Sequence, residues 1–280
     1  MTRVREAATL MLVDDRPDLH VFMLRRNPGS VFGPGAFVFP GGAVDPADSD
    51  PRVTQRVIGL DDRQASARLG VASGGLRVWV GALRETFEEA GILLATHSGT
   101  AALDAARARL NVGELAFADM LTEHGAVLDA SNVSLFSHWL TPVGAPRRYD
   151  TWFLVAPAPS GQEGSHDDAE LVHSEWVRPS DALARHESGD LELIFPTLRT
   201  LRVLESYATA AALLDAVGDA NRATDRPPLV VPDASGQRIA LSRDDLAGAT
   251  SGWRALTSRP DLDGAAFAAE HQLATRRGVA

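Results

Sequence analysis

The sequence predicts an α+β fold in which a mixed β-sheet packs between helices. Apolar runs rich in β-branched and aromatic residues, typical of strands, occur between residues 6 and 177. Runs with apolar residues three and four apart, typical of helices, stand among them without strict strand–helix alternation, which argues against a doubly wound parallel sheet. The length of 280 residues and the 45% hydrophobic content suffice for one large domain or two small ones.

Composition excludes several classes of function. A formal net charge of −10 argues against non-specific binding to nucleic acid or to an anionic membrane surface. The absence of cysteine excludes disulfides, thiolate zinc sites and a cysteine nucleophile. We find no run of 18 apolar residues and no apolar run at the N-terminus long enough for a signal peptide, so we expect a cytoplasmic protein.

The first half of the chain predicts a hairpin followed by a long irregular segment. Two β-rich runs at 6–13 and 20–25 flank an Asp/Pro turn, and a short strand is expected at 37–39. Residues 45–75 lack a sustained apolar period, which indicates a loop with at most one short helix at 61–69. A helix is then expected to begin near Leu76 and to end at Gly91.

The later elements follow from the same patterns. Helices are expected at 101–110 and 113–123, strands at 133–141, 150–156 and 170–177, and a short helix from Pro179. Leucine and alanine at helical spacing predict one core-facing helix over 197–217, ended by Gly218. A β-like pair turning at Ser235-Gly236 and a helix near 263–275 complete the chain. We expect residues 1–210 to form the main domain, with an insertion at about 49–75, and residues 211–280 to form a C-terminal extension packed on or next to it.

Three carboxylates cluster at the end of the helix that begins near Leu76. At about 100° per residue, Glu85, Glu88 and Glu89 fall within about a 100° arc opposite the apolar residues. Such a face is commonly just the solvated side of an amphipathic helix. Acids are disfavoured near a helix C-terminus, however, so the cluster calls for a cation, and hard divalent ions such as Mg²⁺ take carboxylate ligands. Gly81, on the same face one turn earlier, indicates close packing of another backbone segment.

Upstream of this helix, residues 37–39 run into the turn Pro40-Gly41-Gly42. Such a turn is often only a tight connection, and it also lets a backbone approach a ligand without obstruction by side chains. In this order the turn and the helix resemble the signature of the Nudix hydrolase family: Gly, five residues, Glu, seven residues, then Arg-Glu-aliphatic-any-Glu-Glu-any-Gly-aliphatic. Gly42 matches the first glycine, and Asp48 stands in for the first glutamate. The second half is matched by Arg84, Glu85, Glu88, Glu89, Gly91 and Ile92, with Thr86 in place of the aliphatic residue.

The two halves of the signature are far apart. Residues 49–83 number 35, where the signature has seven. A split of this kind is similar to the branch that includes the peroxisomal coenzyme A and acyl-CoA diphosphatases. The segment from Arg26 to Gly42 resembles the upstream element of that branch, which carries two arginines, and Val31 occupies the place of the second. The run from Arg147 to Thr151 is also similar, and the resemblance extends over about residues 6–205.

The resemblance implies a Nudix-type mixed sheet between helices, with an insertion inside the signature and a C-terminal helical extension. It also implies an enzyme that uses Mg²⁺ or Mn²⁺ to cleave the diphosphate linkage of a small-molecule nucleoside diphosphate derivative, with coenzyme A or acyl-CoA as candidates. The metal ligands would be Glu85, Glu88 and Glu89. The catalytic residues would be Glu85, Glu88, Arg84 and Glu170, the last as one choice of general base beside a glutamate of the signature. The substrate would contact Arg26, Gly41, Gly42, Arg147 and Arg148.

Other interpretations stay open at this point. Arg84 could form an ordinary surface salt bridge, the acids around Glu170 could be a solvated turn, and the two arginines at 147 and 148 could be plain surface residues. A nucleotide sugar, ADP-ribose or a dinucleoside polyphosphate is an alternative substrate. A non-catalytic Nudix domain that senses a ligand or serves as an interaction scaffold is an alternative of another class, although the chain lacks a basic recognition helix. Residues 211–280 could form a homodimer contact or a lid.

Overall fold

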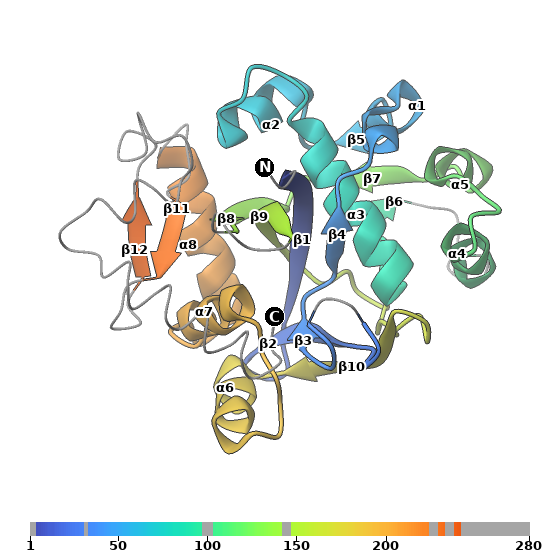
Figure 1. Ribbon diagram of the computed structural model, residues 1–280. Coiled ribbons are helices and arrows are strands. Elements are labelled where there is room, and N and C mark those ends of the chain that lie inside the picture. The colour runs from blue at the N-terminus through green and yellow to red at the C-terminus, as the bar shows by residue number, and fades with distance from the viewer. Residues whose placement is uncertain are drawn as a thin grey trace.

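The computed structural model describes residues 4–30, 33–96, 103–141, 147–223, 229–232 and 238–241. Its main sheet has the strand order β10-β2-β1-β9-β8, with β3 attached to β2 and β4 attached to β1 (Figure 1). The pair β1–β9 is parallel and the other pairs are antiparallel, so the sheet is mixed as expected. The strands are β1 (Val4–Asp15), β2 (Leu19–Arg26), β3 (Phe37–Val38), β4 (Gly41–Ala43), β8 (Ser134–Leu140), β9 (Arg148–Pro157) and β10 (Leu171–Val177).

The central strand β1 is buried on both of its faces, which explains its continuous apolar sequence. Leu10 and Leu12 lie in one core cluster with the helix that carries the acids, and Met11 and Val13 lie in a second cluster on the opposite face. All four side chains are fully buried. The predicted hairpin is confirmed, because β1 and β2 pair in antiparallel fashion around the expected turn.

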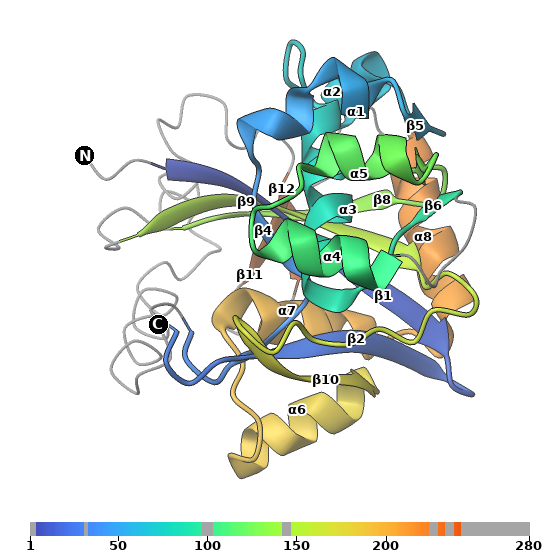
Figure 2. The same ribbon diagram turned by 90° about the vertical axis from the view of Figure 1, so that its right-hand side faces the viewer.

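Helices cover both faces of the sheet, which gives the expected α+β sandwich (Figures 1 and 2). Helix α3 lies on one face against β1 and β4, and α4 packs against α3. Helices α6, α7 and α8 lie on the other face. The bounds are α3 (Leu76–Ala90), α4 (Leu103–Asn111), α5 (Phe117–Glu123), α6 (Pro179–Ser188), α7 (Phe195–Leu204) and α8 (Ala210–Ala223).

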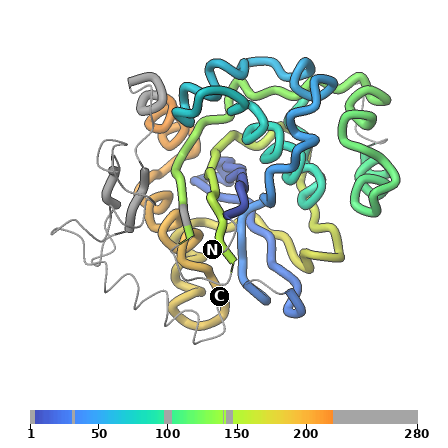
Figure 3. Tube along the Cα trace, turned by 45° about the horizontal axis from the view of Figure 1, so that its top comes forward, coloured from blue at the N-terminus to red at the C-terminus, as the bar shows by residue number. Residues whose placement is uncertain are grey.

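The expectation of a loop over residues 45–75 was wrong. The segment holds the 3-10 helix η1 (Pro46–Ser49), α1 (Pro51–Thr54), strand β5 (Val57–Ile58) and α2 (Asp62–Leu69), of which only α2 was expected. In Figure 3 the chain loops through this segment at the top of the view before it enters α3. Each helix begins at an aspartate cap, at residues 45, 50 and 61, and is too short to show an apolar period. Strand β5 joins a second small sheet with β6 (Ala95–Thr96) and β7 (Val127–Asp129), neither of which was expected.

The single helix expected over 197–217 is two helices, α7 and α8. The Thr209 hydroxyl accepts a hydrogen bond from the Ala212 amide at 3.1 Å, and Asp15 accepts one from the Ala210 amide at 2.6 Å. These side chains cap a new helix start and break the run. The predicted buried face holds only in α7, where Leu201 and Leu204 are fully buried. In the second half it was wrong, because Ala208 and Ala211 are exposed and α8 buries Ala210, Leu213 and Val217 instead.

The last described elements are β11 (Leu229–Pro232) and β12 (Arg238–Leu241), which form the expected antiparallel pair. The turn predicted at residues 235–236 and the helix predicted at 263–275 lie outside the described residues. Among the residues that are described, no helix is long and apolar enough to cross a membrane.

Candidate active site

Helix α3 is anchored at its N-terminal end by the segment inserted in the signature. Gly75 at the N-cap offers no side chain to the free amides of the first turn. Asp62 of α2 replaces that cap, because its carboxylate accepts hydrogen bonds from the amides of Gly74 at 2.9 Å and Leu76 at 3.0 Å. These backbone hydrogen bonds lower the pKa of Asp62, and its negative charge is favourable at a helix N-terminus.

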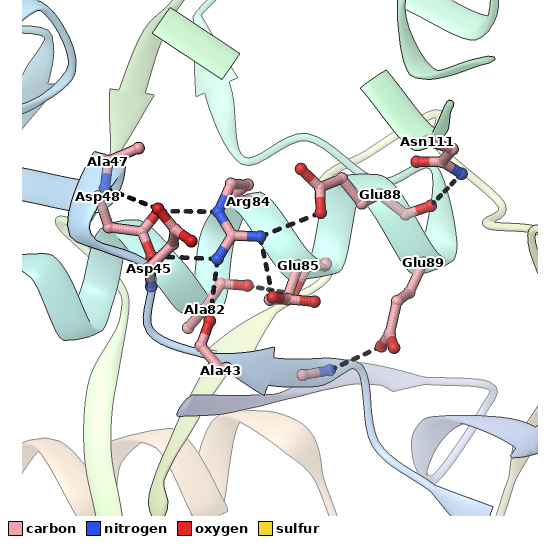
Figure 4. A network of polar contacts seen from close by, with 12 residues as sticks. Ala43, Asp45, Ala47, Asp48, Ala82, Arg84, Glu85, Glu88, Glu89 and Asn111 are labelled. Carbon is pink, nitrogen blue, oxygen red and sulfur yellow. Dashed lines mark hydrogen bonds and ion pairs between the residues drawn. The ribbon is translucent and has the colours of Figure 1, made fainter. Parts of the chain in front are cut away.

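Arg84 lies at the centre of a network of carboxylates (Figure 4). Its guanidinium makes a bidentate pair with Asp48, with Nε–Oδ1 at 2.7 Å and Nη2–Oδ2 at 3.0 Å. Nη1 donates to Glu85 at 2.8 Å and to Glu88 at 3.0 Å, and Nη2 donates to the Ala43 carbonyl at 3.0 Å. The side chains of Arg84 and Asp48 are only 11% and 1% exposed, so the pair is buried and is not a surface salt bridge.

The two glycines of the turn allow β4 to approach the acids of α3. A Cβ atom on Gly42 would lie 2.6 Å from the carboxylate of Glu85. The Gly41 amide donates to Oε2 of Glu89 at 2.8 Å, and a Cβ on Gly41 would lie 2.4 Å from the Ala8 carbonyl oxygen. The close approach inferred from the Gly-Gly pair is therefore present.

Gly81 also lies at a close contact, but its neighbour is not the backbone that we expected. A Cβ atom on Gly81 would lie 2.9 Å from Oδ2 of Asp48, a side-chain oxygen. The glycine makes room for the same carboxylate that pairs with Arg84.

Burial raises the pKa of all three glutamates of the signature. The pKa of Glu89 stands well above its usual value because its carboxylate is buried and lies near Glu85. Burial raises the pKa of Glu85 to about 7 and also raises that of Glu88, although Arg84 opposes both shifts. Burial lowers the pKa of Arg84, but Asp48 and the two neighbouring glutamates raise it further, so the net shift is upward.

The chemistry of this donor set fits a hard divalent cation. Asp48, Glu85, Glu88 and Glu89 carry four negative charges when ionised, against the single positive charge of Arg84. Within the described parts of the chain, no three His, Asp or Glu side chains converge on one point. Arg84 holds the carboxylates of Glu85 and Glu88, whereas that of Glu89 turns to the backbone of β4.

A second polar group lies beside the buried Glu89. Arg26 at the end of β2 pairs with Glu170, with Nη2–Oε1 at 2.6 Å, and the Asn27 amide donates to the Glu170 carbonyl at 2.8 Å. Glu170 raises the pKa of Glu89 and Arg26 lowers it, so both are near enough to act on it electrostatically. The Glu170 side chain is 53% exposed. The structure thus brings together Arg26, Glu170 and the acidic face of α3.

Arg147 and Arg148 lie farther from the acids. Arg148 begins β9 opposite Val4 of β1, whereas Gly42 pairs with Ala8 of the same strand. Four residues of strand separate these positions, or about 13 Å. Arg148 donates from Nε to the Thr141 carbonyl at 3.1 Å. A role of the two arginines in binding substrate stays a prediction.

Sequence reasoning missed residues that hold the C-terminal end of α3. Arg107 of α4 donates to the carbonyls of Glu88 at 2.9 Å and Glu89 at 2.7 Å, and Asn111 donates to the Glu88 carbonyl at 3.1 Å. Arg107 is only 9% exposed. A sequence cue for it existed, because this charged residue falls on the same face of α4 as the apolar Leu103, Ala106 and Leu110.

Comparison with known proteins decides the family. The family model for the NUDT19 Nudix domain matches residues 50–204. The chain belongs to the Nudix hydrolase family. A crystal structure of a NUDIX hydrolase from Alicyclobacillus acidocaldarius is similar at 30% sequence identity and a TM-score of 0.65, over 77% of this chain and 97% of that one. It confirms the Nudix fold expected from the sequence.

Three vertebrate relatives of this Nudix enzyme carry the name acyl-coenzyme A diphosphatase NUDT19. The protein from Gallus gallus is 28% identical, over 73% of this chain and 69% of the relative. The Homo sapiens protein is 27% identical over 81% and 72%, and the Xenopus laevis protein is 29% identical over 68% and 61%. The similarity to the coenzyme A and acyl-CoA diphosphatase branch is therefore confirmed, while the role of each site residue stays a prediction.

Proposed function

We propose that this Nudix enzyme hydrolyses a diphosphate linkage in a nucleoside diphosphate derivative with the help of Mg²⁺ or Mn²⁺, and that coenzyme A or an acyl-CoA is its substrate. The observation that carries the proposal is the group of buried carboxylates of α3 next to the glycine turn of β4, with one arginine to balance them. The names of the vertebrate relatives support this substrate class.

The reaction adds water across a P–O–P bridge. The water oxygen bonds to one phosphorus, the bond from that phosphorus to the bridging oxygen breaks, and a carboxylate takes a proton from the water. Glu170 is our first choice for this base, because it is exposed and lies beside the acidic face. Glu85 is the alternative within the signature, since its carboxylate lies on the acidic face against the backbone of Gly42.

The phosphate groups of the substrate need cationic partners. Arg26 offers a guanidinium beside Glu170, and an arginine can bind phosphate oxygens through two parallel hydrogen bonds. Arg147 and Arg148 would meet a more distant part of the substrate. The backbone of Gly41 and Gly42 would lie near the diphosphate, since it lies directly against the carboxylates of Glu89 and Glu85.

Glu85, Glu88 and Glu89 would hold the divalent cation. A bound cation supplies positive charge that offsets the negative charge of the reacting diphosphate. Arg84 would orient Glu85 and Glu88 through its two Nη1 contacts and would anchor them to Asp48.

A panel assay tests the proposal. The protein is incubated with Mg²⁺ or Mn²⁺ and with coenzyme A, an acyl-CoA, ADP-ribose, a nucleotide sugar or a diadenosine polyphosphate, and the products are separated. We expect cleavage of coenzyme A or acyl-CoA into a 3′,5′-bisphosphate nucleotide and a phosphopantetheine. Glu89→Gln should lose at least about 100-fold in kcat, because it keeps an acceptor for the Gly41 amide but removes the charge. The matched control is Glu187→Gln, at an exposed position of α6.

The outcomes separate the alternatives. Cleavage of ADP-ribose or a dinucleoside polyphosphate alone would overturn the substrate and keep the reaction, and Val31 in place of a second arginine makes this the nearest alternative. Tight binding of a nucleotide without turnover would favour a sensing domain. No turnover of any compound, with equal metal affinity in Glu89→Gln and wild type, would overturn the enzyme proposal. Sedimentation of the full chain tests whether it forms a homodimer.

A further inference from the structure

The C-terminal end of α3 and the loop before β10 share one buried side chain, Arg107. Its Nε and Nη2 donate to the carbonyls of Glu88 and Glu89, as described above. Its Nη1 and Nη2 also donate to Ser165, to Oγ at 3.2 Å and to the carbonyl at 2.9 Å. One guanidinium therefore binds the backbone of Glu88, Glu89 and Ser165, although Ser165 lies 76 positions after Glu89 in the chain.

Hydrogen bonds also hold the loop against the last residue of α3 and the residues that follow it. The Ser165 amide donates to the Ala90 carbonyl at 2.8 Å. Gln162 accepts from the Leu93 amide at 2.8 Å and donates to the Leu93 carbonyl at 3.0 Å. A Cβ atom on Gly164 would lie 2.8 Å from Cδ1 of Ile92. Five residues after Ser165 the same loop ends at Glu170, the candidate base.

The charge of Arg107 suits its position. The last carbonyls of a helix carry partial negative charge, and a cation there is stabilising. The acids in the last turns of α3 add to this negative charge. The sequence indicated the same excess of negative charge at this end of the helix. Burial lowers the pKa of Arg107 from its usual value, but an arginine stays protonated near neutral pH, so the contact does not switch off there. Gly91 leaves the space that the guanidinium needs, since a Cβ there would lie 2.9 Å from Nη1.

We infer that Arg107 is a positioning residue for the hydrolytic site. Its hydrogen bonds fix the backbone of Glu88 and Glu89 relative to that of Ser165. They thereby set the distance between the acidic face of α3 and Glu170. This inference rests on the proposed function. The reaction rate is sensitive to this distance, since a misplacement of a catalytic group by about 1 Å can lower the rate about 100-fold.

The test compares three variants of the full chain. Arg107→Met removes the guanidinium, and Arg107→Lys keeps a positive charge with a single donor group. Arg109→Ala is the matched control, because Arg109 lies two residues along α4, is half-exposed and, within the described residues, forms an ion pair only with Glu123 of α5. For each variant we measure kcat and KM on the best substrate, the melting temperature, and amide hydrogen exchange of residues 158–170.

We expect kcat to fall about 10- to 100-fold in Arg107→Met and Arg107→Lys, with KM within about threefold of wild type. Hydrogen exchange of residues 158–170 should speed up in both variants and stay unchanged in Arg109→Ala. In combination with Glu170→Gln, the losses in kcat should be less than multiplicative, because both act through the same group. A purely structural role predicts instead a lower melting temperature with full kcat in the fraction that stays folded.

The inference is overturned if the folded Arg107→Lys protein keeps kcat within about twofold, or if its loop exchanges at the wild-type rate. A wild-type protein that cleaves none of the diphosphates is a different failure. It overturns the proposed function, and the exchange measurement then still reports whether Arg107 ties the loop to α3.

Discussion

Replacing Arg84 by methionine should destabilise the folded protein strongly in the absence of divalent metal. The change keeps most of the side-chain volume and removes the guanidinium that pairs with Asp48. That carboxylate is 1% exposed and would keep the Asp45 amide, at 2.8 Å, as a donor. Removing one partner of a buried ion pair typically costs about 3–5 kcal/mol, because the other charge is left uncompensated.

Urea denaturation at pH 7 in the presence of a chelator measures this effect as a change in the free energy of unfolding. The double variant Arg84→Met/Asp48→Asn should recover most of the loss, since it neutralises the stranded charge. The matched control is Arg52→Met, which breaks a pair with Asp50 that is also held by two guanidinium nitrogens, together with a second exposed pair with Asp119. Arg52 is 58% exposed, so the control should shift the midpoint little.

Two results would refute the argument. If Arg84→Met and Arg52→Met shift the midpoint alike, the network around Arg84 is not buried as the structure has it. If the double variant is as unstable as Arg84→Met, the loss comes from packing and not from the charge of Asp48.

The glycine turn and the titration of the acids can be tested by substitution and by pH. Gly42→Ala should reduce turnover at least about 10-fold with little change in melting temperature, because the new Cβ meets the movable end of Glu85. Gly41→Ala should instead lower the free energy of unfolding by about 1–3 kcal/mol, because its Cβ meets the Ala8 carbonyl. Equal effects on stability would contradict this. Without metal, the free energy of unfolding should fall by up to about 3 kcal/mol between pH 4.5 and 7, because folded Glu85 keeps a proton up to about pH 7 that the unfolded chain releases near pH 4.5. If the free energy of unfolding of Glu85→Gln falls with pH as steeply as that of wild type, Glu85 is not the group that titrates. Mg²⁺ affinity, measured by calorimetry, should rise over the same pH range, since the cation requires ionised carboxylates, and a flat profile would count against these ligands.

The sequence was sufficient for the elements whose signal is local. The buried strands β1 and β2 show as apolar runs, and α3 shows through its apolar stripe and Gly91. The glycine turn and the acids were found as types of residue at a spacing, and the structure places them in contact. Their proximity could be predicted because both belong to the two halves of one signature, even though 35 residues separate those halves.

Elements that depend on distant partners could not be predicted in this way. Strand β5 has two residues and pairs with β7, about 70 positions away. The break between α7 and α8 depends partly on Asp15, from the other end of the domain. Arg107 was missed because a charged residue within an apolar stripe gives no indication of which carbonyls it will meet.

The inserted segment is better understood as part of the site than as an interruption of it. It begins right after Asp48, which pairs with Arg84 and so joins the two halves of the signature in space. It also contains α2, whose Asp62 caps the N-terminal end of α3, where Gly75 has no side chain to do so. At the other end of α3, Arg107 binds the last carbonyls. An acid at the N-terminus and an arginine at the C-terminus are the charges that a helix favours at its two ends. The helix that carries the glutamates is therefore held by two side chains that lie outside the signature, and the signature alone cannot specify the geometry of the site.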